Sequence, residues 1–211
     1  MGELGHIDPQ VGLVDYLFAQ PGEPRHLIDD LLPLFGRDCV AFGQGLTIVG
    51  RCPLLGFVAR FLAMHPEHRD DIAAHLDDES FLRNAVEELV RVHGLANTAR
   101  IVTHDFTYKN IAFRAGDAVL PANLFVGLDD RRIKDPLTVD FRRAAPAPHA
   151  TFGNGPHICP GAILARREIK IFLQEWLKRI PVFGIEPGTK PVLVTGMVNG
   201  VLELRLTWPL T

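Results

Sequence analysis

Hydrophobic residues recur at helical spacing in three parts of this chain. The segments 66–76, 80–92 and 162–180 place apolar residues every three or four positions, which is typical of amphipathic helices. Ser80 is predicted to be the N-cap of the second helix, and Pro181 is expected to end the third. The third pattern is the clearest, with an apolar face formed by Ala165, Ile169, Phe172, Leu173, Trp176 and Ile180.

A mostly apolar stretch at 31–64 is interrupted by glycine and proline. It is long enough for one buried helix, but Pro53 is expected to kink or divide such a helix because proline lacks a backbone N–H donor. The longest apolar run in it, 54–64, contains Arg60 and is shorter than the roughly 20 apolar residues that cross a bilayer. The pattern therefore predicts a buried helical segment and no membrane span.

Short strands are predicted in the middle and at the end of the chain. Residues that favour strands, separated by turn residues, occur at 100–106, 111–113 and 118–120. The segment 125–148 shows no clear period, and 192–206 alternates loosely around two glycines like a closing hairpin. The predicted fold class is α+β, mainly α-helical with small β-sheets.

Composition places the chain among ordinary globular proteins. Its 211 residues suffice for one domain or two small ones, with 47% apolar residues, 22% charged residues and a formal net charge of -3. This near-neutral balance gives no support to binding of nucleic acid or of a membrane surface. The three cysteines form no CxxC pair and the first residues carry no apolar signal sequence, so a cytoplasmic location is expected.

One stretch carries candidate chemistry. The sequence FGNGPHICPG, from Phe152 to Gly161, places a single cysteine, Cys159, just before the predicted helix at 162–180. The N-terminus of a helix favours negative charge and therefore stabilises a thiolate. Glycines remove side chains where the backbone approaches another group closely. The pattern indicates a thiolate metal ligand with backbone N–H groups around the sulfur.

Other kinds of site fit this stretch less well. A dinucleotide-binding loop needs glycine where the chain has Ile158, and a strand before the loop. A zinc site needs a second ligand cluster at suitable spacing beside His157 and Cys159. A Cys–His nucleophile requires a distant histidine. The remaining interpretation is a buried structural cysteine in a glycine-rich loop.

The stretch resembles the haem-binding loop of the cytochrome P450 family. The resemblance is carried by Phe152, Gly153, Gly155, His157, Cys159 and Gly161, followed by Leu164, Ala165 and Arg166. Two further elements occur in the expected order: Glu88-Leu-Val-Arg91 is similar to the family's Glu-x-x-Arg helix, and 139–143 is similar to its meander. Segments such as 62–69 and 196–201 look like those of soluble bacterial camphor hydroxylases.

The resemblance covers about residues 56–208 and implies the C-terminal half of the cytochrome P450 fold. The chain, 1–211, is then a partial domain of this family. Residues 56–211 are expected to form its helical region, meander and haem-binding loop. Residues 1–55 are expected to form a divergent or truncated region that includes a disrupted central helix.

The resemblance also implies how haem is held. Cys159 is implied to be the thiolate ligand of the iron of haem b, with Phe152 packed beside the sulfur. Space for the porphyrin and for the start of the helix is implied at Gly155 and Gly161. Residues implied to pair with the haem propionates are Arg100 and His149, with His157 as a further partner.

Two other family features bear on folding and on oxygen chemistry. A buried ion cluster is implied for Glu88 and Arg91 together with Arg142 or Arg143. The candidate catalytic alcohol is Thr47, and the residue directly before it, Leu46, is not acidic. Without delivery of protons by a general acid, reduced oxygen is expected to leak away as peroxide or superoxide.

The function implied by the resemblance is haem-thiolate monooxygenation. One oxygen atom from O2 would enter a small apolar organic substrate, with electrons from NAD(P)H through a ferredoxin-type donor that docks near Arg166 and Arg167. The alternative is a truncated relative that binds haem weakly or not at all, catalyses nothing and exposes a large apolar surface. A haem-based sensor module is a third alternative.

Overall fold

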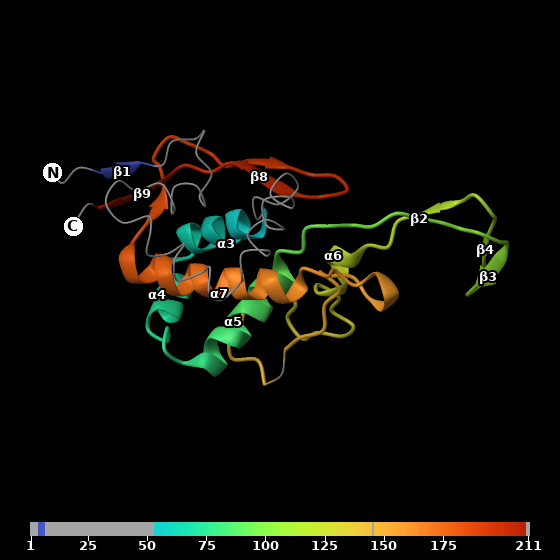
Figure 1. Cartoon of the computed structure of the whole chain (residues 1–211), viewed down its shortest axis with the longest axis horizontal. Coiled ribbons are helices and arrows are strands. Elements are labelled where there is room, and N and C mark those ends of the chain that lie inside the picture. The colour runs from blue at the N-terminus through green and yellow to red at the C-terminus, as the bar shows by residue number, and fades with distance from the viewer. Residues whose placement is uncertain (1–3, 7–52, 145, 210–211) are drawn as a thin grey trace. The chain divides into compact units, whose positions relative to one another are not determined.

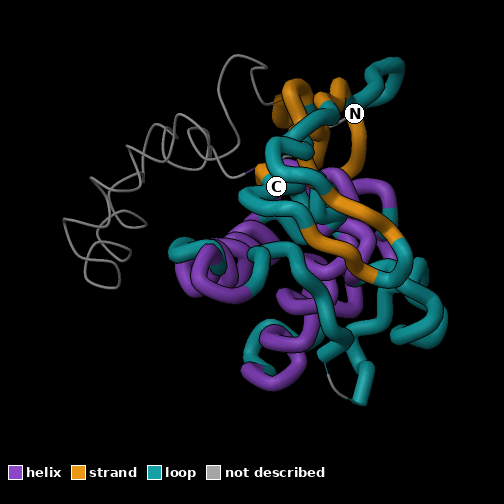
Figure 2. The backbone as a smooth tube through the Cα atoms, turned by 90° about the vertical axis from the view of Figure 1, so that its right-hand side faces the viewer, coloured by secondary structure: helices purple, strands orange, loops and turns teal. Residues whose placement is uncertain are grey.

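The computed structural model describes residues 4–6, 53–144 and 146–209. The described residues form short strands among helices and loops, as Figure 2 shows, which confirms the predicted α+β class. They divide into two compact units, which are described separately. Unit 1 contains 4–6, 53–76, 171–193 and 200–209, and unit 2 contains 77–144, 146–170 and 194–199.

Unit 1 combines helices with a small antiparallel sheet. Its helices are α3 (Pro53–Met64), α4 (Pro66–Ala73) and the part of α7 (Ala162–Arg179) that follows Lys170. The sheet has the strand order β1-β9-β6, formed by β1 (Leu4–His6), β6 (Gly184–Ile185) and β9 (Leu206–Pro209). In Figure 1, β1 and β9 lie side by side, because Gly5 is in register with Trp208. The predicted closing hairpin is formed by β7 (Val192–Val194) and β8 (Gly200–Glu203).

Aromatic side chains form the centre of the core of unit 1. Trp176 on α7 is 1% exposed and stacks on Phe172, with 5.7 Å between the ring centroids. Phe183 and Trp208 meet the same indole edge-on, at 5.6 Å and 5.8 Å. Edge-to-face and offset contacts of this kind suit the charge distribution of aromatic rings. The sheet is thereby attached to the helix through side chains that the helical pattern had placed on the apolar face.

Unit 2 contains the second long amphipathic helix and the irregular segments. Its elements are α5 (Glu79–Val92), the β2–β5 pair (Arg100–Ile101 with Ala118–Val119), the β3–β4 hairpin (Phe106–Tyr108 with Ile111–Phe113), α6 (Asn123–Val126), a 3-10 turn (Gly155–His157) and the start of α7. The buried face of α5 includes Phe81, Ala85 and Leu89, as its spacing predicts. The segment without a clear period, from 127 onward, is loop up to the 3-10 turn wherever it is described.

Three boundaries differ from the prediction. The N-cap of α5 is Asp78, not Ser80, because the Asp78 carboxylate accepts the backbone N–H groups of both Ser80 and Phe81 at 2.9 Å. The helix predicted at 66–76 ends at Ala73, where the His75 N–H bonds to the Ile72 carbonyl in a tighter turn.

The third difference is that the strand predicted at 100–106 is two strands, β2 and β3. The β3–β4 hairpin turns at Lys109 and Asn110, both at positive φ (49° and 66°), a conformation that suits a two-residue hairpin turn. The division of a longer helix at Pro53 concerns residues outside the described part, and within that part Pro53 is the first residue of α3.

We expect Asp78→Ala to lower the free energy of unfolding by about 1 kcal/mol, because two N–H groups of α5 lose their acceptor. Urea denaturation of the two chains measures this difference. The matched control is Asp77→Ala, which removes the neighbouring exposed carboxylate and leaves the cap intact. Equal effects of the two substitutions would contradict the assignment of the cap.

Candidate functional site

The segment 152–161, here called the cysteine loop, is held by backbone hydrogen bonds. The Cys159 N–H donates to the Phe152 carbonyl at 2.8 Å, so the loop closes on itself. Gly153 and Gly155 have φ of 73° and 70°, a left-handed conformation that strains residues with a side chain. Two of the three loop glycines are thus needed for the backbone path that leads to Cys159.

Cys159 ends the cysteine loop next to the first turn of α7. The Ala162 N–H donates to the Cys159 carbonyl at 3.2 Å, which places this cysteine directly before the helix, as predicted. The cysteine is exposed and forms no disulfide. A Cβ atom built on Gly161 would lie 3.7 Å from the Cys159 sulfur, and one built on Gly155 would meet open space. Exposed apolar side chains flank Cys159 in the sequence, with Ile158 before it and Ile163 after it. A thiol with open, partly apolar surroundings fits a planar apolar group bound through sulfur.

A buried ion cluster on α5 anchors the irregular segment that precedes the loop. Arg91 is 1% exposed and donates to both oxygens of the Glu88 carboxylate, at 2.7 Å and 2.8 Å. Arg143 donates to the same carboxylate at 3.0 Å, and so does the Asp140 N–H. Arg142 instead lies over the ring of Phe81, which decides between the two arginines that the sequence left open. The structure therefore brings Glu88, Arg91 and Arg143 together.

The remaining N–H groups of Arg91 bind backbone oxygens of the irregular segment 127–143, which ends in the stretch that resembles the family's meander and is called the meander from here on. They donate to the carbonyls of Gly127 and Pro136, both at 2.6 Å, and of Thr138 at 3.2 Å. A Cβ atom on Gly127 would lie 2.9 Å from the Arg91 side chain, so glycine is required for this approach. Burial favours the neutral form of Glu88, but the hydrogen bonds from Arg91, Asp140 and Arg143 outweigh burial and lower the pKa of its carboxyl.

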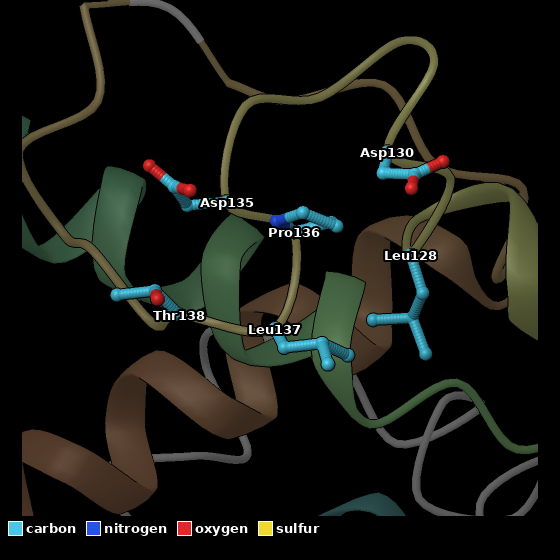
Figure 3. A pocket seen from close by; sticks show the side chains of 6 residues that line it. All are labelled: Leu128, Asp130, Asp135, Pro136, Leu137 and Thr138. Atoms are coloured by element: carbon cyan, nitrogen blue, oxygen red, sulfur yellow. The ribbon is translucent and has the colours of Figure 1, made fainter.

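A hollow of about 390 Å³ lies against the same meander, and Figure 3 shows the side chains that line it. Its lining is formed by Leu128, Asp130, Asp135, Pro136, Leu137 and Thr138. None of these residues belongs to the cysteine loop. The Pro136 and Thr138 carbonyls accept hydrogen bonds from Arg91, so the lining of the hollow adjoins the ion cluster and does not include Cys159.

A second carboxylate of α5, Glu87, binds residues on both sides of the cysteine loop. Arg166 on α7 donates to its two oxygens at 2.5 Å and 3.0 Å. His149 approaches the same carboxylate with Nε2, at 3.3 Å. The Thr151 N–H donates to His149 Nδ1, so Nε2 carries the hydrogen that faces Glu87. The guanidinium of Arg166 also lies over the Phe152 ring, 4.6 Å from its centroid.

The other predicted site residues are less closely joined to Cys159. Arg100 is exposed at the start of β2 and donates to the Ala99 carbonyl at 2.9 Å. His157 is exposed in the 3-10 turn of the cysteine loop. Both ring nitrogens of His149 are occupied by Glu87 and Thr151, so this geometry assigns the imidazole to Glu87 and gives no support to a propionate contact. Thr47 lies outside the described residues.

Comparison with known proteins decides the family. The family model described as Cytochrome P450 matches residues 63–201. This chain belongs to the cytochrome P450 family. P450 enzymes are haem monooxygenases that hold the iron of haem b through a cysteine thiolate, and the matched range 63–201 includes Cys159.

Individual relatives agree with this assignment. The probable cytochrome P450 127A1 of Sinorhizobium fredii is 38% identical over 99% of this chain and 48% of its own length. The vitamin D3 dihydroxylase of Streptomyces griseolus is 35% identical over 67% of this chain and 36% of its own length. Among solved structures, that of CYP101J2 superposes with a TM-score of 0.68 at 39% identity, covering 74% of this chain and 39% of the other. The chain spans about half, or less, of the length of these relatives.

The residues present fit haem b. Haem needs a thiol that is free, accessible and surrounded by space for a flat ring, and Cys159 has these properties next to Gly155 and Gly161. None of the helices in the described part has both the length and the hydropathy needed to cross a bilayer.

Two residues near the site were not found from the sequence. Glu87 is the first of two adjacent glutamates, and only the second belongs to the recognised motif. Gly127 belongs to no recognised motif. It must be glycine because the Arg91 side chain, 36 positions away in sequence, approaches its backbone closely. Arg166 was expected near the docking surface of an electron donor, and its partly exposed side chain also binds Glu87 and lies over the Phe152 ring.

Replacement of Arg91 by alanine should destabilise the chain strongly, by about 3–5 kcal/mol, because a buried Glu88 carboxylate would lose its main partner. Chemical denaturation, followed by circular dichroism, measures the loss. Arg131→Ala removes an exposed ion pair with Asp129 in the same segment and should leave stability unchanged. A small effect of Arg91→Ala would mean that the cluster does not hold the meander.

Acid should remove the stabilisation that Glu87 provides. Burial favours its neutral form, but the hydrogen bonds from His149 and Arg166 outweigh burial and lower its pKa from 4.5 to about 2. The stabilisation is therefore complete above pH 4.5 and is lost as the pH falls from 4.5 towards about 2. The difference in free energy of unfolding between the native chain and Glu87→Gln, measured against pH, should shrink over this range. A difference that does not change with pH would contradict the assignment.

Proposed function

We propose that this chain supplies the haem-binding part of a monooxygenase that inserts one oxygen atom from O2 into a small apolar organic substrate. The observation that carries the proposal is the exposed thiol of Cys159 at the start of α7, in a loop whose glycines leave space beside it. The P450 family to which the chain belongs supports the same reaction class. Composition supports a cytoplasmic location.

The residues of the chain hold and shield the cofactor. Haem b, when bound at Cys159, supplies one-electron redox chemistry and the activation of O2. Cys159 would provide the sulfur that binds the iron, and Phe152, whose carbonyl accepts the Cys159 N–H, would pack beside that sulfur. Of the proposed propionate partners, Arg100 and His157 are exposed cationic or imidazole groups, which suit carboxylates. Thr47 remains the proposed alcohol for proton delivery.

The overall reaction consumes one reduced nicotinamide for each oxygen atom inserted. A C–H bond of the substrate becomes C–OH, and the second oxygen atom of O2 leaves as water. NAD(P)H gives up two electrons and becomes NAD(P)+, and the ferredoxin-type donor delivers these electrons one at a time. One proton from NAD(P)H and one from solvent complete the water molecule.

Surface residues support a docking site and an apolar pocket wall. Arg167 is exposed on α7, and a cation there would attract an acidic ferredoxin. The exposed apolar residues Met197 and Val198 lie on a segment that pairs with 95–97, with the Asn97 N–H donating to the Met197 carbonyl at 2.9 Å. We assign this paired segment to the wall of the substrate site.

A second candidate is a relative that does not catalyse when it consists of this chain alone. The observation in its favour is the number of large apolar side chains that are exposed in unit 2, such as Phe106 (44%), Tyr108 (59%) and Ile111 (58%). In this candidate the chain keeps the cysteine motif and holds haem weakly or not at all.

The absorbance spectrum of the haem-reconstituted chain, reduced and exposed to carbon monoxide, distinguishes the two candidates. A strongly red-shifted Soret band, absent from Cys159→Ser and retained by Cys39→Ser, is the expected result, because only a thiolate ligand produces that shift. Product formation with NADH and a surrogate ferredoxin is then tested on the same sample. A band typical of neutral-ligand haem, or no retained haem, would overturn the proposal in favour of the second candidate.

A further inference from the structure

The Glu87 carboxylate connects the chain before the cysteine loop to the chain after it. His149 precedes the loop and Arg166 follows it on α7, and both bind this one carboxylate. The Thr151 hydroxyl also donates to the Val90 carbonyl on α5, at 3.0 Å. Both ends of the loop are therefore attached to the same stretch of α5.

A continuous series of contacts runs from Glu87 to the backbone of Cys159. Arg166 uses its N–H groups on Glu87 and the face of its guanidinium on the Phe152 ring. Phe152 in turn accepts the Cys159 N–H at 2.8 Å. A planar guanidinium can form a bidentate ion pair and stack on an aromatic ring at the same time, which an ammonium group cannot do.

Glu87 differs from its neighbour Glu88 in what it holds. Consecutive residues of an α-helix point about 100° apart, so the two carboxylates face different segments. Glu88 is 4% exposed and binds the meander, whereas the Glu87 side chain is 18% exposed and binds the flanks of the cysteine loop. A change at Glu87 therefore leaves the buried cluster intact.

We propose that Glu87 is a positioning residue that holds the cysteine loop, through His149 and Arg166, in the conformation that presents the Cys159 thiol. The significance for haem rests on the proposed function, but the effect on the loop does not. An ion pair that only added stability would change all parts of unit 2 alike. A positioning role changes the cysteine loop in particular.

Hydrogen exchange of the chain without haem tests the proposal directly. In Glu87→Gln, peptides that cover 152–161 should exchange on the order of tenfold faster, because a charge-assisted hydrogen bond to the loop flank is lost. The rate at which iodoacetamide alkylates Cys159, measured by mass spectrometry, should rise together with the exchange rate. Peptides that cover 66–73 in unit 1 serve as the internal reference for overall stability.

Glu79→Gln is the matched control. Glu79 on α5 binds Lys170 on α7 at 2.6 Å, so it joins the same two helices within unit 2 with no contact to the cysteine loop. Its substitution should leave loop exchange at the native rate. Arg166→Lys is a second variant, which keeps the positive charge and removes the planar stack on Phe152, and its loop should also exchange faster.

Two results would overturn the proposal. The first is that the exchange rate of the loop and the alkylation rate of Cys159 stay within twofold of those of the native chain in both Glu87→Gln and Arg166→Lys. Equal acceleration in Glu79→Gln would be the second, because it would show a general weakening between helices. In the reconstituted chain, Glu87→Gln should raise the share of the neutral-ligand band with carbon monoxide. If the native chain retains no haem, the proposed function fails, and the exchange experiment still decides the role of Glu87.

Discussion

The buried pair of Glu88 and Arg91 is the contact on which the irregular part of unit 2 depends. Both groups are almost fully removed from water, so each would bear a large desolvation cost without the other. Arg91 uses its remaining N–H groups on carbonyls of the meander, which has little regular secondary structure of its own. The pair therefore determines the path of the meander, because the meander lacks the hydrogen bonds of a regular helix or sheet that would otherwise fix it.

Helix α5 uses two adjacent carboxylates for two different purposes. Glu88 holds the meander, and Glu87 holds the flanks of the cysteine loop. An amphipathic helix provides such an arrangement because its apolar face is fixed in the core and its side chains diverge from one residue to the next. In the proposed haem site, a helix that provides no ligand atom would thus position the ligand cysteine, a common arrangement around metal sites.

The length of the chain relative to other P450 proteins bears directly on its chemistry. The chain matches about half of the length of such a relative, and that half includes the cysteine loop, the meander and the Glu-x-x-Arg helix. Large apolar side chains of the β3–β4 hairpin are exposed, and apolar area exposed to water carries a free-energy cost. The two candidate functions therefore differ in one physical property of the chain. A monooxygenase must bind haem firmly beside this partly open apolar surface, whereas the inactive relative binds it weakly or not at all.

The sequence by itself predicted the amphipathic helices α4, α5 and α7, the α+β class and the candidate ligand Cys159, and its resemblance to the family implied the pairing of Glu88 with Arg91. These features depend on residues close together in the chain, where helical period and motif spacing are legible. Only the tertiary structure decided that Arg143 and not Arg142 completes the cluster, that Arg166 binds Glu87, and that Gly127 must lack a side chain. Each of these contacts joins residues that are far apart in sequence. A local sequence pattern does not predict them, because it does not indicate which distant side chains the fold brings into contact. The cap at Asp78 is a smaller case, since two possible N-caps two residues apart are distinguished only by where the backbone begins to turn.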